Sequence, residues 1–182
     1  MSTTSCRLDT KEFPIPTFPD QPKLRIGTQL DAVYTRLLRS GHGFANPRLR
    51  PGKPVVVVVF DPCCAWCHHF WDAMFGLRDQ IDFRWYPVCV SRDMSTALGA
   101  QILSADEPWE AMADHQEEFE DYEDRADVRG SQAARDMVWE NARLFRKSGG
   151  TSVPLAIYKD KVGNYRAFLA EDSVSEVLKA VG

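Results

Sequence analysis

The sequence contains no hydrophobic run long enough to cross a membrane as a helix. Its longest apolar run is Val55 to Phe60, whereas a spanning helix needs roughly 18–20 such residues. The chain also lacks a basic stripe and carries a formal net charge of −4, so we expect no membrane span and no nucleic-acid partner. No basic segment precedes an apolar one at the N-terminus, so we expect no signal peptide in this chain. Two expectations for its location stay open: the cytoplasm, or export after removal of a signal.

Cysteine is scarce as well. The chain has five cysteines, a number that is both too small and odd for a fold held together by disulfides. Three of them, Cys63, Cys64 and Cys67, lie within five residues, and this clustering indicates chemistry rather than structural cross-linking. Cys89 lies in an apolar stretch and is predicted to be a buried core thiol, while no structural role is expected for Cys6.

The length of the chain suits one domain preceded by two short segments. Closely spaced prolines predict an extended arm over residues 1–27. Apolar spacing predicts a helix over residues 28–41, with Thr28 as its N-cap and Gly41 at its end. Residues 42–182 then form the main domain.

The main domain begins with a βαβ pattern. The unbroken run Val55 to Phe60 predicts a strand buried on both faces of a sheet. A helical pattern starts at Cys64, and Ile81 to Val90 is the next strand candidate, so the order indicates a right-handed βαβ unit. Helical patterns alone fill residues from about 95 to 147, where Ser131 is predicted to cap the last helix.

The C-terminal part predicts a hairpin and a helix. Leu155 to Tyr158 and Tyr165 to Leu169 read as antiparallel strands around the turn Gly163-Asn164. An amphipathic helix is predicted from Ser173 onward. The fold class is therefore α/β, with a helical insertion between the βαβ half and the hairpin half.

The segment Cys64-Ala-Trp-Cys67 carries the predicted chemistry. A cysteine at the start of a helix lies near free N–H groups and the positive end of the helix dipole, which lower a thiol pKa from ~8.5 into the range of roughly 3.5–7.5. Cys67 lies one turn further along the helix and is close enough to form a disulfide. We therefore predict that Cys64 attacks a substrate disulfide and that Cys67 resolves the mixed disulfide. Trp66 is predicted to contact the substrate, because the middle positions of such a motif are normally exposed; a packing role is the alternative.

The whole layout resembles the thioredoxin superfamily, and in particular the catalytic domain of DsbC/DsbG-type bacterial disulfide proteins. The resemblance includes Asp61-Pro62 before the motif and Val153-Pro154 before the hairpin. It implies that Pro154 is cis and faces the cysteine pair, and that the backbone of Val153 binds the substrate chain. It further implies protein substrates with thiols or disulfides, a redox partner protein and a periplasmic location. No dissociable cofactor is expected, because the cysteine pair is itself the redox centre.

Three features depart from this family. Only about 27 residues precede the helix over residues 28–41, so the N-terminal dimerisation domain is expected to be absent and the helix to correspond to the linker. The residue before the proline is Val153. DsbC and DsbG usually have threonine at this position, whereas the oxidase DsbA has valine. Cys63 adds a thiol beside the predicted nucleophile. The direction of the reaction (isomerase, oxidase or reductase) and the choice between monomer and dimer therefore stay open.

The same cysteines raise a second hypothesis, a thioredoxin-fold carrier of copper or zinc. Thiolates with the adjacent imidazoles of His68 and His69 suit either metal. A closed site usually needs a second ligand pair elsewhere, and the chain offers only poor candidates, so no metal ligand is predicted.

Three further residues are predicted modulators of the motif: Cys63, His68 and Asp61. For Cys63 the simpler interpretation is a small residue that fills the position before the nucleophile. His68 is expected to tune the thiolate or to lie on the helix surface. The acidic stretch from Asp114 to Asp127 is interpreted as a solvated helix surface, with a partner-docking face as the alternative.

Overall fold

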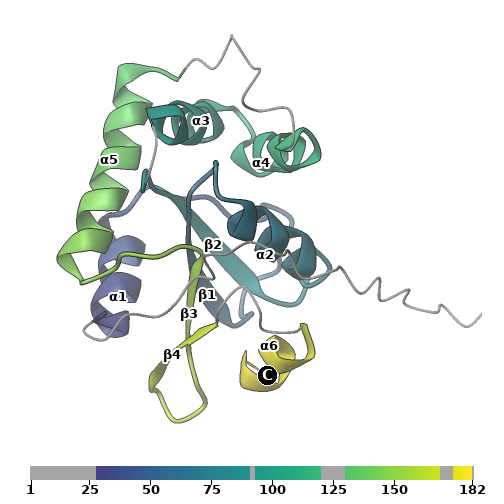
Figure 1. Cartoon of the computed structure of the whole chain (residues 1–182). Helices are drawn as coiled ribbons and strands as arrows, with labels where there is room; N and C mark the ends of the chain where they lie inside the picture. Colours follow the sequence, from purple (N-terminus) through teal and green to yellow (C-terminus); the bar gives the residue numbers. More distant parts are fainter. Residues whose placement is uncertain (1–27, 91–92, 120–129, 169–173, 182) are drawn as a thin grey trace, which may run out of the picture.

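The computed structural model describes residues 28–90, 93–119, 130–168 and 174–181 (Figure 1). These residues form a mixed sheet with helices on both faces. The predicted arm over residues 1–27, including Cys6, lies outside the described residues.

The sheet has four strands in the order β2-β1-β3-β4. β1 pairs in parallel with β2 and antiparallel with β3, which forms a hairpin with β4. Gly163 adopts a φ of 90° in the hairpin turn, a conformation that favours glycine. The predicted α/β fold class and the hairpin are therefore confirmed. The strands span Val55–Phe60 (β1), Asp82–Pro87 (β2), Leu155–Lys159 (β3) and Tyr165–Phe168 (β4).

β1 is buried on both faces, as its unbroken apolar run predicts. Val56, Val58 and Phe60 belong to the core on one face of the sheet. Val57 and Val59 belong to the core on the opposite face. Alternate side chains of a strand point to opposite faces, so five consecutive apolar residues are what a central strand requires.

The two faces of the sheet are covered by different helices and have different cores. The first core contains residues of α2 (Ala65–Phe75) and α6 (Val174–Val181), and aromatic rings dominate it. The second contains residues of α1 (Leu30–Ser40) and α5 (Gln132–Lys147) and is mostly aliphatic. Figure 1 shows the two pairs of helices on opposite sides of the sheet.

α1, which covers the predicted linker-like helix, packs directly on the sheet. Val33 and Leu37 are fully buried, and α1 contacts β1, β3 and α5. The predicted N-cap at Thr28 is wrong: the helix starts one residue later, and the cap residue is Gln29. The Thr28 hydroxyl donates to the carbonyl oxygen of Gly149.

In the described residues, the predicted helical insertion contains α3 (Asp93–Ser104), α4 (Pro108–Glu117) and α5. Ser131 caps α5 as predicted, because its side chain accepts from the N–H of Ala134. α5 lies along the sheet, whereas α3 and α4 lie beyond the end of the sheet from which the chain enters α2 (Figure 1). In the described parts of the chain, no helix combines the length and apolar character that a membrane span needs.

Candidate functional site

Cys64 lies at the junction between β1 and α2. Its N–H donates to the carbonyl oxygen of Asp61 at 3.0 Å, which closes a tight turn directly after the strand. Cys64 is the N-cap residue of α2, and its own carbonyl accepts from the N–H groups of Cys67 and His68. The thiol is therefore held beside the N-terminal end of the helix, where negative charge is favoured.

Cys67 lies one turn further along α2, inside the protein. Only 2% of the residue is exposed, and its Sγ accepts from the backbone N–H of Asp61 at 3.5 Å. Both cysteines are free thiols. A hydrogen bond from the Cys67 thiol lowers the pKa of Cys64, although burial opposes this shift. Burial raises the pKa of Cys67 well above its usual range, so Cys64 is the thiol that ionises first.

The segment before β3 faces this pair. The peptide bond between Val153 and Pro154 is cis, as the resemblance implies. The Cys64 thiol donates to the carbonyl oxygen of Val153 with an Sγ···O distance of 3.8 Å. Two segments that are 89 residues apart in sequence are thus joined at the motif.

The buried carboxylate of Asp61 stabilises the turn between β1 and α2. The residue is 1% exposed, and its carboxylate accepts from the N–H of Cys63 and from the N–H of Val90, each at 2.8 Å. The carboxylate therefore ties the turn before Cys64 to the segment that follows β2. Its negative charge also makes a small contribution that raises the pKa of both Cys64 and Cys67.

Trp66 was expected to be exposed, but it is buried. Only 5% of its surface is accessible, and its ring lies edge-on to the ring of His69. The middle of the motif is the first turn of α2, and this large ring turns into the protein there. Substrate contact by Trp66 stays a prediction, without the exposure on which it was based.

The other predicted modulators contact the helical insertion. Cys63 is half-buried and packs near Leu98 and Phe119. The ring of His68 stacks on the ring of Phe119 at a centroid distance of 4.4 Å. Its Nδ1 lies 2.6 Å from Oε1 of Gln116, in the last turn of α4.

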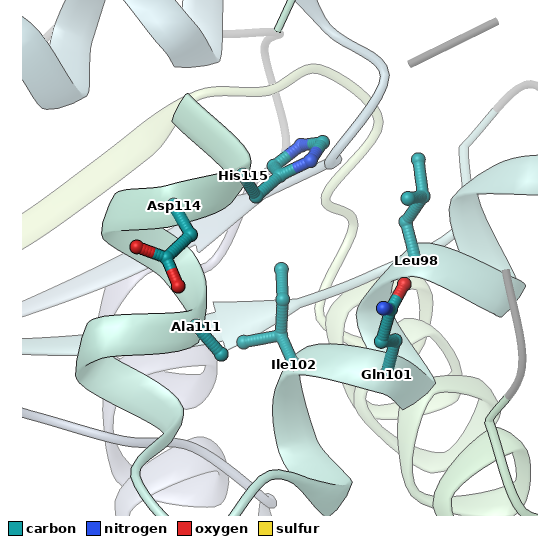
Figure 2. A pocket seen from close by; sticks show the side chains of 6 residues that line it. All are labelled: Leu98, Gln101, Ile102, Ala111, Asp114 and His115. Carbon is teal, nitrogen blue, oxygen red and sulfur yellow. The ribbon is translucent and has the colours of Figure 1, made fainter. Parts of the chain in front are cut away.

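His115 also reaches the motif, a contact that no sequence pattern predicts. Its Nε2 lies 2.9 Å from the carbonyl oxygen of Pro62, two residues before Cys64. The same residue borders a cavity of about 110 Å³ between α3 and α4 (Figure 2). The cavity is lined by Leu98, Gln101, Ile102, Ala111, Asp114 and His115.

A metal-ligand cluster is not found within the described ranges: no group of three or more His, Cys, Asp or Glu side chains there is arranged to hold an ion. His68 is directed to Gln116 and to Asp72, whose Oδ2 lies 3.5 Å from its Nε2. Burial lowers the pKa of His69.

The chain is similar to known proteins in sequence and in structure, although no protein-family model matches it. A curated relative, the thiol:disulfide interchange protein DsbG of Pseudomonas aeruginosa, is 26% identical over 117 residues, which are 63% of this chain and 46% of the relative. The chain thus spans about half the length of that relative.

Solved structures give the same picture of the fold. Proteus mirabilis ScsC in a compact conformation matches with a TM-score of 0.62 and 16% identity, over 88% of this chain and 81% of that one. The chain has a thioredoxin-like fold. Helicobacter pylori DsbG matches with a TM-score of 0.56 and 15% identity, over 71% of this chain and 60% of that one. A periplasmic thioredoxin-like protein from Salmonella enterica serovar Typhimurium matches with a TM-score of 0.57 and 14% identity, over 87% and 96%. The predicted thioredoxin-like fold and the resemblance to DsbC/DsbG-type proteins are therefore confirmed.

Proposed function

We propose that the chain is a thiol–disulfide oxidoreductase that acts on protein disulfides through Cys64 and Cys67. The observation that carries the proposal is the asymmetry of the pair. Cys64 lies at the helix start beside Val153 and has a lowered pKa, whereas Cys67 is buried behind it with a raised pKa. The relative named a thiol:disulfide interchange protein supports the same chemistry.

In the proposed reaction the Cys64 thiolate attacks one sulfur of a substrate disulfide. A mixed disulfide forms, and the other substrate sulfur leaves as a thiolate that takes up a proton. Cys67 then loses its proton and attacks the Cys64 sulfur, which releases the second substrate thiol and forms the Cys64–Cys67 disulfide. Two electrons pass to the substrate, and the reverse sequence oxidises a dithiol.

The cis turn provides the proposed substrate-binding edge. The Val153 carbonyl already lies within reach of the Cys64 thiol, so a peptide bound along Val153 and Pro154 would present its sulfur to that thiol. No dissociable cofactor takes part, because electrons enter and leave through the cysteine pair. A redox partner protein restores the pair after each turnover.

We place the activity in the periplasm. This is supported by the similarity to the Salmonella protein described as periplasmic. The direction of exchange follows from the reduction potential of the Cys64–Cys67 pair. Among related cysteine pairs this potential ranges from about −270 mV in thioredoxin to about −120 mV in DsbA. A titration against glutathione measures it directly.

The decisive test is insulin reduction by the full chain and by Cys64→Ala. We expect the variant to fall to the uncatalysed rate, because it lacks the attacking sulfur. Cys89→Ala is the matched control, since it removes a partly buried thiol outside the motif and should retain activity. Exchange that survives in Cys64→Ala would contradict the proposal.

A further inference from the structure

The last turn of α4 places two buried polar side chains against the redox motif. His115 is 3% exposed and Gln116 is 6% exposed. Burying such groups costs free energy unless each one is hydrogen-bonded. Apolar side chains would fill the same space without that cost, so the partners of these two residues indicate their role.

His115 holds the turn on the N-terminal side of the motif. A carbonyl oxygen can only accept, so the proton lies on Nε2 of His115, which donates to Pro62 at 2.9 Å. Pro62 lies inside the turn that the Cys64 N–H closes on Asp61. Fixing this carbonyl therefore fixes the orientation of the peptide plane that leads into Cys63 and Cys64.

Gln116 holds the helix on the other side of the motif. Its Oε1 accepts from Nδ1 of His68 at 2.6 Å, while its Nε2 lies 3.6 Å from Sδ of Met112, which orients the amide. Because Phe119 stacks on the His68 ring, the ring is held both in its plane and on one face. His68 follows Cys67 directly, and its N–H donates to the Cys64 carbonyl.

His115 packs against the ring of Phe119 but also borders a cavity. It is one of the residues that line the space between α3 and α4 (Figure 2). A side chain at this position that lacked the hydrogen bond could move toward the cavity. The Pro62 carbonyl would then be free to rotate.

We propose that His115 and Gln116 are positioning residues of the redox motif, which hold the Pro62 carbonyl and the His68 ring so that Cys64 stays within reach of the Cys67 thiol. The proposal rests on the proposed function for the purpose of this arrangement. Neither residue touches the reacting sulfurs. Both act through the turn and the helix between which the two cysteines lie.

The test follows the alkylation of Cys64 by iodoacetamide as a function of pH, with the labelled residue identified by mass spectrometry. His115→Leu and Gln116→Met remove the donor and the acceptor. We expect alkylation of Cys64 near neutral pH to slow by about threefold to tenfold in each, since loss of the Cys67 hydrogen bond lowers the thiolate fraction. The glutathione equilibrium of the pair should shift with it. His115→Gln and Gln116→Glu keep a donor and an acceptor and should retain most of the wild-type rate.

Glu117→Gln is the matched control, because it is an exposed residue of the same helix turn. A lowered melting temperature with unchanged alkylation and glutathione equilibrium would show a merely structural role and overturn the proposal. If His115→Leu fails to fold, the Gln116 pair of variants decides alone. Alkylation needs no substrate protein, so a wild-type chain without exchange activity would refute the proposed function while the alkylation results still judge the positioning roles.

Discussion

Cys64 and Cys67 lie in two different regions of the molecule, although less than one full helical turn separates them. Cys64 occupies the boundary between the loop and α2, where the helix has free N–H groups and the Val153 carbonyl is nearby. Cys67 lies among aromatic side chains of the core, including Phe60 and Phe70. The pKa of the first is lowered and that of the second is raised. Two identical side chains thus have pKa values shifted in opposite directions, because one lies where α2 begins and the other lies inside the core.

The difference has a simple physical origin. A thiolate at a helix start gains hydrogen bonds and a favourable dipole, whereas a thiolate in an apolar core loses its hydration and gains little. The Cys67 thiol also donates to Cys64, so each cysteine reinforces the shift of the other. The proposed division of labour between an attacking and a resolving thiol follows from this asymmetry.

The largest expected effect concerns the covalent intermediate. In Cys67→Ala the mixed disulfide on Cys64 cannot be resolved from within, so we expect substrate-linked protein to accumulate. Cys64→Ala should yield none. Non-reducing gel electrophoresis after incubation with a disulfide-containing protein measures both.

The double variant Cys64→Ala/Cys67→Ala is the background for this measurement. Adducts that persist in Cys64→Ala and vanish in Cys67→Ala would exchange the roles of the two thiols. The two thiols would then still differ in their surroundings, but that difference would not decide which of them attacks the substrate.

A smaller effect is expected in the pH dependence of the wild-type thiols. The thiolate is the reactive form, so a lowered pKa moves the rise in alkylation rate to lower pH and a raised pKa moves it higher. Alkylation of Cys64 should therefore level off below the usual range of about 8.5, and that of Cys67 should begin only above it. At pH 7 we expect Cys64 to react at least about tenfold faster. Iodoacetamide labelling of the reduced protein, resolved by residue, measures the two profiles, and faster labelling of Cys67 would contradict the comparison.

The sequence was sufficient to predict the buried strand β1, the position of Cys64 at the start of a helix and the hairpin turn around Gly163. A short unbroken run of β-branched residues favours a strand that is buried on both faces. A helical pattern that begins directly after such a strand places Cys64 at a helix start. These are local consequences of residue type and spacing. The hairpin around Gly163 follows from turn chemistry in the same way.

The sequence was insufficient for the contacts of the insertion. His115 and Gln116 fall in the acidic stretch that was interpreted as a solvated surface, yet both are buried against the motif. Their neighbour Glu117 is exposed, as the charge pattern suggested. The partners Pro62 and His68 lie 53 and 48 residues away in sequence. Such pairings depend on how α4 packs, and the local pattern contains no information on that. The burial of Trp66, which matches the packing alternative, likewise depends on tertiary structure rather than on the local pattern.

The smallest effect is expected for the third thiol of the motif. Cys63 adjoins Cys64, but the structure gives it a different environment: its side chain packs near Leu98 and Phe119, and its backbone N–H donates to Asp61. Alanine keeps that backbone hydrogen bond and removes the thiol from the contact with Leu98 and Phe119. We therefore expect Cys63→Ala to cost about 1 kcal/mol or less in urea unfolding. Its rate of insulin reduction should lie within about twofold of wild type, because the Cys64–Cys67 pair is unchanged. A loss of exchange as complete as that of Cys64→Ala would show that proximity in sequence, rather than placement at the helix start, decides which thiols take part.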